Sequence, residues 1–195
     1  IGETEARRFV VPSAPGKRDV EDTKVTDLLL LCHELARQQL DIAEPFSRIE
    51  ERYGEIVEGL GVDLDIIGLL NQLRVDIEQG ASVDFVASRG EHLNGRVMAA
   101  TLDATFVEPA EVIKFTGSGA LDNQTYRLIE EKISGSGRYV IPGFYGAAPD
   151  GEIKTFSRGG SDITGAVVAR AVTAEVYENW TDVSGMLMAD PRIVP

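Results

Sequence analysis

Residues 152–162 combine a strand end, a glycine pair and the start of a helix, an arrangement suited to binding an anion. Gly159 and Gly160 provide a turn without side chains, and Ser161 is a good N-cap for the apolar run that follows. The first turn of a helix has unpaired N–H groups that favour a carboxylate or a phosphate. Arg158 adds a planar guanidinium that suits a carboxylate. The sequence therefore predicts an anion site here, with a purely structural turn as the alternative.

Asp162 lies in the expected first turn of the same helix. A carboxylate at this position stabilises the helix dipole, which is the simpler interpretation. If the side chain points into the anion site instead, it would hold a catalytic lysine or a metal ion. The residues alone leave both roles open.

A second candidate is the Ser88-Arg-Gly-Glu91 turn, which interrupts an otherwise apolar helical pattern. A glycine inside a helix costs about 1 kcal/mol relative to alanine, so its presence indicates close approach of another backbone segment or a ligand. Glu91 would then accept a hydrogen bond from an amine of the ligand. The alternative is an exposed glutamate on a helix.

The loop at residues 12–17 is a third candidate, because it leaves the carboxyl end of an expected strand. Ser13 offers a hydroxyl, Gly16 an open backbone and Lys17 a positive charge. A plain surface loop explains the same residues.

These candidates need elements to position them, and the apolar patterns predict an α/β fold around one sheet. Thr26 or Asp27 would cap the first helix, and the last strand would follow the glycine-pair helix. Strands are expected at 9–11, 105–107, 113–115, 139–142, 153–156 and 174–180, and helices at about 27–40, 44–60, 64–79, 82–104, 121–133 and 163–172.

Two of these helices show clear faces. In residues 44–60, Ile49 and Tyr53 fall on the apolar face, and Arg52 is expected on the charged, solvated face. In residues 64–79, Ile67 is expected in the core. The helix at 163–172 is almost wholly apolar, which predicts that it is buried against the sheet.

Composition limits the classes of partner. The chain has 195 residues, 43% hydrophobic and 26% charged, with a net charge of −13, which disfavours a nucleic-acid backbone or an anionic membrane as partner. Without a recognisable signal peptide or spanning segment, we expect a cytoplasmic protein. Cys32, the one cysteine, is expected to be buried, and two histidines are too few for a histidine metal site. A metal would be held by carboxylate and phosphate oxygens, which points to Mg²⁺.

Four motifs together resemble those of an aspartate kinase in the amino acid kinase family. They are spread over nearly the whole chain in the same order as in that family. The motifs are Ser13-Ala-Pro-Gly-Lys17 with Lys24-Val-Thr-Asp-Leu-Leu29, Ser88-Arg-Gly-Glu91, Phe156-Ser-Arg-Gly-Gly-Ser-Asp162, and Trp180-Thr-Asp-Val-Ser-Gly185 with Ala189-Asp-Pro-Arg192.

The resemblance implies a three-layer α/β/α sandwich around a mainly parallel sheet. It also implies transfer of the ATP γ-phosphoryl group, with Mg²⁺, to the side-chain carboxylate of L-aspartate. Asp162 matches the residue that organises catalytic lysines. Aspartate would bind to Thr26, Glu91, Arg158, Gly159, Gly160 and Ser161, and the nucleotide to Thr181, Asp182, Leu187 and Arg192.

The chain departs from the family pattern in three respects. Leu187 stands where the family usually has a tyrosine in the nucleotide site. The lysine-glycine-glycine motif of the first strand would precede Ile1, and a later lysine would follow Pro195. We therefore expect residues 1–195 to be a partial catalytic domain with a helical segment at about 27–104, lacking the regulatory domains and belonging to a homo-oligomer when complete.

Two other classes remain open. A sister kinase acting on glutamate, acetylglutamate or a nucleotide would share the fold and the glycine pair. Glu91 discriminates among these substrates, because an N-acetylated or phosphate substrate has no ammonium for it to bind. A non-catalytic module that binds aspartate is the second alternative.

Overall fold

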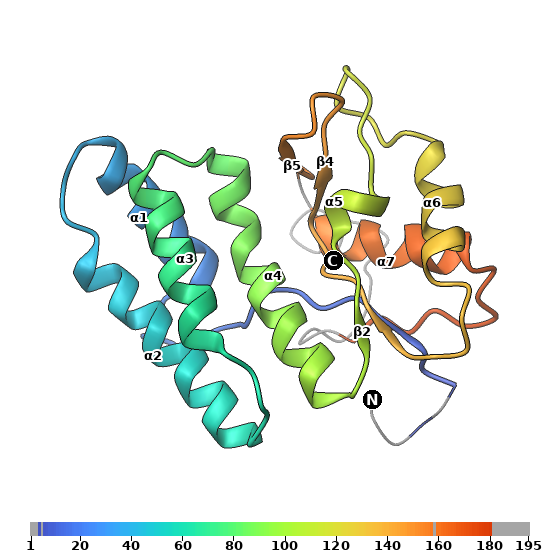
Figure 1. The fold of residues 1–195 in the computed structure, drawn as a ribbon, viewed down its shortest axis with the longest axis horizontal. Helices are drawn as coiled ribbons and strands as arrows, with labels where there is room; N and C mark the ends of the chain where they lie inside the picture. Colours follow the sequence, from blue (N-terminus) through green and yellow to red (C-terminus); the bar gives the residue numbers. More distant parts are fainter. Residues whose placement is uncertain (1–3, 5, 158, 181–195) are drawn as a thin grey trace, which may run out of the picture.

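The computed structural model describes residues 4, 6–157 and 159–180, and the ribbon has a helical part beside a sheet-containing part (Figure 1). The helical part runs in chain order through four helices that lie side by side. They are α1 (Val25–Arg37), α2 (Ala43–Leu60), α3 (Ile66–Glu78) and α4 (Val83–Thr101).

The sheet-containing part holds the remaining elements. Its strands are β1 (Phe9–Val10), β2 (Thr105–Phe106), β3 (Tyr139–Val140), β4 (Tyr145–Ala147) and β5 (Ile153–Thr155), and its helices are α5 (Pro109–Val112), α6 (Gln124–Lys132) and α7 (Gly160–Ala171). β1, β3 and β2 form a parallel sheet in that order, with Tyr139 in register with both Phe9 and Thr105. β4 and β5 form an antiparallel pair, with a turn at Asp150 and Gly151 between them.

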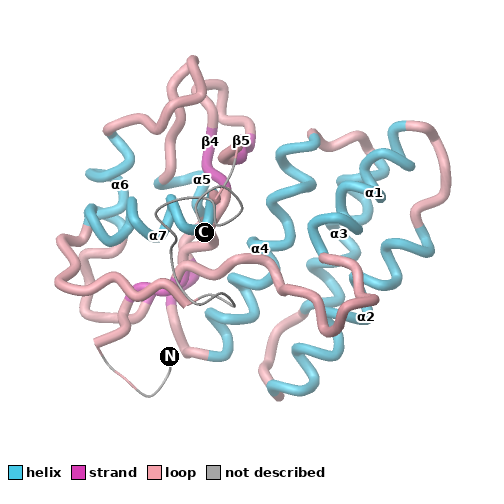
Figure 2. The backbone as a smooth tube through the Cα atoms, turned by 180° about the vertical axis from the view of Figure 1, so that it is seen from behind, coloured by secondary structure: helices cyan, strands magenta, loops and turns pink. Residues whose placement is uncertain are grey.

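Side chains alternate across the parallel strands, and this alternation creates the layers. Val10 and Val140 point to one side, where they pack with Ala99 near the end of α4. Tyr139 and Ile141 belong to a second cluster on the other side. That cluster includes Ile129 of α6 with Val167 and Val168 of α7. The expected three-layer α/β/α arrangement is therefore confirmed, and the view from behind shows the same order (Figure 2).

A separate core holds the helical part together. Its fully buried members include Leu29, Phe46, Ile49 and Tyr53, and it extends to α4. Cys32 is buried here as predicted, and burial raises the pKa of its thiol to about 11.

Several local predictions in the helical part were wrong. Ile67 is 70% exposed, because it lies on the outward face of α3, whereas its neighbour Ile66 is buried in the core. α1 begins at Val25 after Lys24, and no side chain caps it, so neither Thr26 nor Asp27 is the N-cap. Arg52, expected in solvent, is buried.

The predicted strand at 174–180 is also wrong. These residues form no ladder with any other described segment, and Val176 and Trp180 are largely exposed. β1 and β2 each pair with β3 alone, and residues 174–180 pair with neither of them, so strand-forming side chains did not suffice to form a strand here. At 113–115 the chain makes only isolated bridges, through Lys114 and Phe115.

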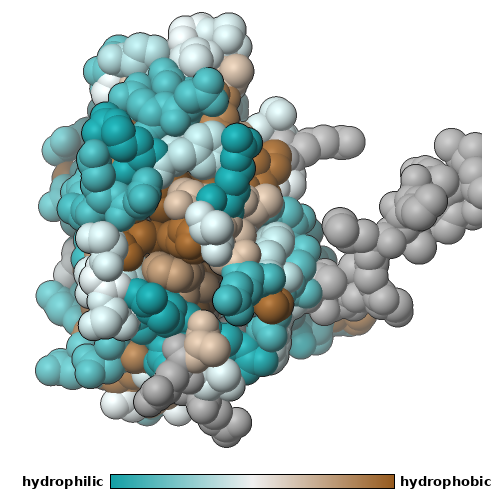
Figure 3. All heavy atoms as spheres, turned by 90° about the vertical axis from the view of Figure 1, so that its right-hand side faces the viewer, coloured by the Kyte–Doolittle hydropathy of each residue, from teal (hydrophilic) through white to brown (hydrophobic). Residues whose placement is uncertain are grey.

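α7 is half-exposed rather than wholly buried. Thr164, Val167 and Val168 face the core, whereas Ile163 and Ala166 face outward. Figure 3 views the molecule from the right-hand side of Figure 1, where α6 and α7 lie, and shows apolar atoms between hydrophilic ones. Within the described ranges, no helix is both long and apolar enough to cross a membrane.

Candidate functional site

Glu91 is the most unusual charged residue in the described structure. It lies in the middle of α4, only 7% of the residue is exposed, and its Oε2 has no hydrogen-bond partner. Burial raises the pKa of this carboxyl to about 7, although the backbone N–H groups of Glu91 and Ala14 and the charge of Arg89 act to lower it. A buried carboxylate with an unused oxygen can bind a cation that brings its own hydrogen-bond donors.

Gly90 allows the loop after β1 to approach α4. A Cβ atom on Gly90 would lie 2.8 Å from Ala14 Cβ and 3.6 Å from Val25 Cγ1. Tyr53 of α2 donates a hydrogen bond of 2.7 Å from its hydroxyl to the Gly90 carbonyl. The close approach predicted from the glycine is therefore confirmed, and it brings the β1 loop and the start of α1 against the turn that carries Glu91.

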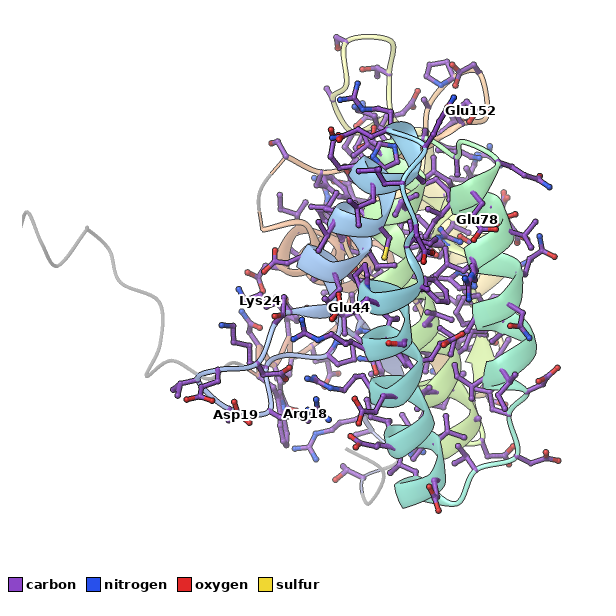
Figure 4. All side chains as sticks on the ribbon, turned by 90° about the vertical axis from the view of Figure 1, so that its left-hand side faces the viewer. Arg18, Asp19, Lys24, Glu44, Glu78 and Glu152 are labelled. Atoms are coloured by element: carbon purple, nitrogen blue, oxygen red, sulfur yellow. The ribbon has the colours of Figure 1, made fainter. Side chains whose placement is uncertain are left out.

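Thr26 reaches this region through α1. It is half-buried in the first turn of that helix, next to Val25, which contacts the Gly90 position. The loop between β1 and α1 is attached to α4 by Asn94, whose Nδ2 donates to the Ser13 carbonyl at 2.6 Å. Figure 4 shows the outer part of this loop, with Arg18, Asp19 and Lys24, projecting beside the helical part.

The glycine pair at the start of α7 allows a second close crossing. A Cβ atom on Gly160 would lie 2.7 Å from Phe144 Cδ2, and one on Gly143 would lie 2.6 Å from Ser161 Cα. Phe144 has a φ of 79°, in the left-handed region that non-glycine residues rarely adopt. The segment leaving β3 therefore crosses directly over the first turn of α7.

Gly159, and not Ser161, is the N-cap of α7. Gly159 is left-handed with a φ of 56°, and no side chain caps the helix, so the capping role predicted for Ser161 is wrong. Ser161 is already inside the helix, where its hydroxyl lies against Gly143. An uncapped first turn leaves backbone N–H groups available to a ligand.

Asp162 is exposed at the same helix start. Its Oδ1 accepts a hydrogen bond of 3.3 Å from Asn179 Nδ2. Among the described residues, no lysine forms an ion pair with Asp162, so its role in organising lysines stays a prediction. The predicted Arg158, Thr181, Asp182, Leu187 and Arg192 lie outside the described residues.

A polar cluster that sequence reasoning missed lies on the sheet side of α4. His92 Nδ1 is 3.1 Å from Tyr145 Oη and 3.1 Å from Glu108 Oε2. Burial lowers the pKa of His92, which is therefore neutral at pH 7. Burial acts to raise the pKa of Glu108, but the hydrogen bonds from His92 and Tyr145 and the charge of Arg89 together lower it below its ordinary value, so the carboxyl stays ionised. The partners are 16 and 53 residues from His92 in sequence, so no local pattern indicates them.

Arg52 is the other missed residue. Its Nη1 donates to the Gly16 carbonyl at 2.6 Å, and its Nη2 forms a buried ion pair with Asp22. One signal was available, because Arg52 is three residues after Ile49 and four before Ile56, which places it on the buried stripe of α2. Among the described residues, no group of three or more metal-binding side chains comes together.

The sequence matches known proteins over nearly its full length. A model of the amino acid kinase family matches residues 7–195. Aspartokinase 3 of Bacillus subtilis is 34% identical over 97% of this chain and 45% of its own length, and the aspartokinase of Saccharomyces cerevisiae is 29% identical over 87% and 38%.

Solved structures agree. The crystal structure of Clostridium acetobutylicum aspartate kinase has a TM-score of 0.91 at 50% identity, covering 98% of this chain and 45% of that one. E. coli aspartokinase III, in complex with aspartate and ADP, has a TM-score of 0.77 at 25% identity, covering 96% and 45%. The chain thus spans slightly less than half the length of these proteins.

Proposed function

The chain belongs to the amino acid kinase family, and we propose that it forms the greater part of the catalytic domain of an aspartate kinase. The complete protein would transfer the γ-phosphoryl group of ATP to the side-chain carboxylate of L-aspartate, giving 4-phospho-L-aspartate for lysine, threonine and methionine synthesis. We further propose that it is a cytoplasmic homo-oligomer.

The buried, half-satisfied carboxylate of Glu91 is the observation that carries the substrate assignment. An ammonium group offers both a positive charge and N–H donors to the free Oε2. Aspartate has such a group, whereas acetylglutamate and nucleotides do not. Glutamate also has one, so the choice between aspartate and glutamate rests on the similarity to aspartokinases.

Aspartate would lie between α4 and the start of α7. Glu91 binds its ammonium, and Arg158 binds a carboxylate as a planar fork. The remaining contacts come from Thr26 of α1 and from the uncapped first turn of α7, at Gly159, Gly160 and Ser161.

The nucleotide would bind beyond residue 180, where Thr181, Asp182, Leu187 and Arg192 match the family's nucleotide site. The described residues fit an anionic ligand at the neighbouring helix start, because α7 begins at a left-handed glycine without a side-chain cap. Mg²⁺, when bound with ATP, supplies positive charge that offsets charge on the transferring phosphoryl group.

The chemistry needs alignment more than base catalysis, because the attacking group is already a carboxylate. Holding both ends of aspartate fixes its side-chain oxygen in line with the phosphoryl group. Asp162, at the same helix start, would orient the lysines that neutralise the developing charge.

An ATP-dependent hydroxamate assay on the complete protein tests the proposal. We expect β-aspartyl hydroxamate with aspartate and at least tenfold less product with glutamate. Equal or faster turnover of glutamate would identify a glutamate kinase. Aspartate binding by calorimetry without any ATP-dependent product would instead identify a non-catalytic binding module.

A further inference from the structure

Arg52 is a buried arginine whose contacts all lead to one loop. Its side chain is 6% exposed and that of its partner Asp22 is 7% exposed. Burying an ion pair is costly and contributes little net stability compared with apolar residues of similar size. The conformation that the pair imposes is therefore the property to explain.

The pair closes residues 16–22 into a compact turn. Arg52 binds the Gly16 carbonyl at one end and the Asp22 carboxylate at the other. Asp22 also accepts from the Arg18 backbone N–H at 2.8 Å, and Asp19 accepts from the backbone N–H of Asp22 at 3.0 Å. One guanidinium thus fixes both ends of this turn to α2.

The same loop forms one wall around Glu91. Ala14 lies two residues before Gly16, packs on the Gly90 position, and donates its backbone N–H toward the Glu91 carboxylate. Asn94 holds the adjacent Ser13 carbonyl. If residues 16–22 lost their contacts with α2, the segment that follows Ala14 would become mobile, and water could reach the Glu91 carboxylate.

Tyr53, the next residue of α2, supports the opposite wall. It is fully buried, and its hydroxyl donates to the carbonyl of Gly90, directly before Glu91. Consecutive residues on one helix thus reach the loop and the α4 turn, which enclose the same carboxylate.

We propose that Arg52 is a positioning residue for the subsite that binds the substrate ammonium, acting through the residue 13–22 loop on Glu91. The inference rests on the proposed function, because it assumes that Glu91 binds the ammonium of aspartate. It adds a role for α2, which has no residue among the predicted site residues.

Replacing Arg52 should affect aspartate more than ATP. In Arg52→Met we expect the KM for aspartate to rise about 10- to 100-fold, with kcat and the KM for ATP within about threefold of wild type. The KM for aspartate of Arg52→Lys should lie between those of wild type and Arg52→Met, because a lysine ammonium can pair with Asp22 but cannot also reach the Gly16 carbonyl as the guanidinium does.

The pH profile separates positioning from a merely structural role. Burial is the largest cause of the raised pKa of Glu91, so admitting water should lower that pKa toward its ordinary range. The groups that act on Glu91 are Arg89 on its own helix, Tyr53 on α2 and the Ala14 N–H, while α1 presents the apolar Val25 to this turn. In Arg52→Met the inflection of kcat/KM for aspartate should move to lower pH.

The experiment uses the complete protein, with Arg74→Met as the matched control. Arg74 lies on α3, pairs with Glu78 and packs over the ring of Phe46, and neither partner belongs to the residue 13–22 loop. Its replacement should therefore leave the KM for aspartate and the pH inflection unchanged. Hydrogen exchange without ligands should show faster exchange at residues 13–22 in Arg52→Met and not in Arg74→Met.

Three results would overturn the proposal. The first is a KM for aspartate within twofold of wild type together with an unchanged pH inflection. The second is an equal rise in the KM values for aspartate and ATP, and the third is unchanged hydrogen exchange at residues 13–22. If Arg52→Met does not fold, Arg52→Lys and Asp22→Asn decide the same readouts. Failure of wild type and Arg74→Met to phosphorylate aspartate would refute the proposed function instead, and the exchange result would still report on the loop.

Discussion

Replacing Glu91 with glutamine tests the ammonium subsite directly. In the unliganded protein, burial holds the pKa of this carboxyl at about 7 instead of its ordinary 4.5. That difference corresponds to about 3 kcal/mol for ionising the side chain in place. A bound ammonium would offset this cost, so aspartate binding and ionisation of Glu91 should be coupled.

The coupling predicts a specific pH profile. In wild type, kcat/KM for aspartate should fall nearly tenfold for each pH unit below about 7, because the protonated carboxyl has no charge for the ammonium. Glu91→Gln should lack this inflection. At pH 8 its kcat/KM for aspartate should be lower by roughly 2 to 5 kcal/mol, which is about 30- to several-thousand-fold, while the KM for ATP stays nearly unchanged.

The assay is hydroxamate formation by the complete protein between pH 5.5 and 8.5. Glu130→Gln, which changes an exposed glutamate on α6, is the control and should match wild type. An unchanged aspartate dependence in Glu91→Gln, or a wild-type profile without an inflection between pH 6 and 8, would refute the assignment.

The same group predicts how stability depends on pH. Its folded pKa lies above its unfolded value, so its contribution to stability is fully present below about pH 4.5 and is lost as the pH rises through about 7. Saturating aspartate should restore the lost stability in wild type. Thermal melts of Glu91→Gln should show neither that loss nor an equal gain from aspartate.

Three other predictions concern single residues. Leu187→Tyr should tighten ATP binding by about 1 kcal/mol in calorimetry, and unchanged or weaker binding would show that Leu187 is outside the nucleotide site. Gly143→Ala should lower the free energy of unfolding by about 1 to 3 kcal/mol in urea, because its Cβ would lie 2.6 Å from the backbone of Ser161; wild-type stability would contradict that crossing. Because burial lowers the pKa of His92, stability should be retained above its ordinary pKa and lost as the pH falls below it. His92→Gln should make the melting temperature less dependent on pH between pH 5 and 6.5. An equal pH dependence in wild type and variant would count against a buried neutral histidine.

Local patterns predicted most of the helices and the close approach of a loop to the turn that carries Glu91. Helical periodicity placed a helix at 44–60, and α2 spans Ala43–Leu60. The glycine before Glu91 predicted a close approach, and Ala14 makes it. These predictions succeeded because each depends on a few neighbouring residues and on the steric demand of one position.

The failures depend on partners distant in sequence. Arg52 was assigned to solvent because of its charge, yet Asp22, thirty residues earlier, neutralises it in the interior. Residues 174–180 have strand-forming side chains, but they pair with neither β1 nor β2, and local propensity does not encode such pairing. Arg158 and the residues after 180 remain predictions from the family motifs.

The position of α4 has a consequence for unfolding. Val86, Leu93 and Val97 belong to the core of the helical part, while Ala99 belongs to the cluster under the parallel sheet. Asp84, near the start of α4, also binds Lys154 and Thr155 of β5. One helix therefore contributes to the core of the helical part and to the cluster around Val10 and Val140, so neither half of the described chain keeps its full set of core contacts if the other melts. Amide hydrogens along α4 should be the slowest to exchange, and those of these two clusters should open together as one cooperative unit.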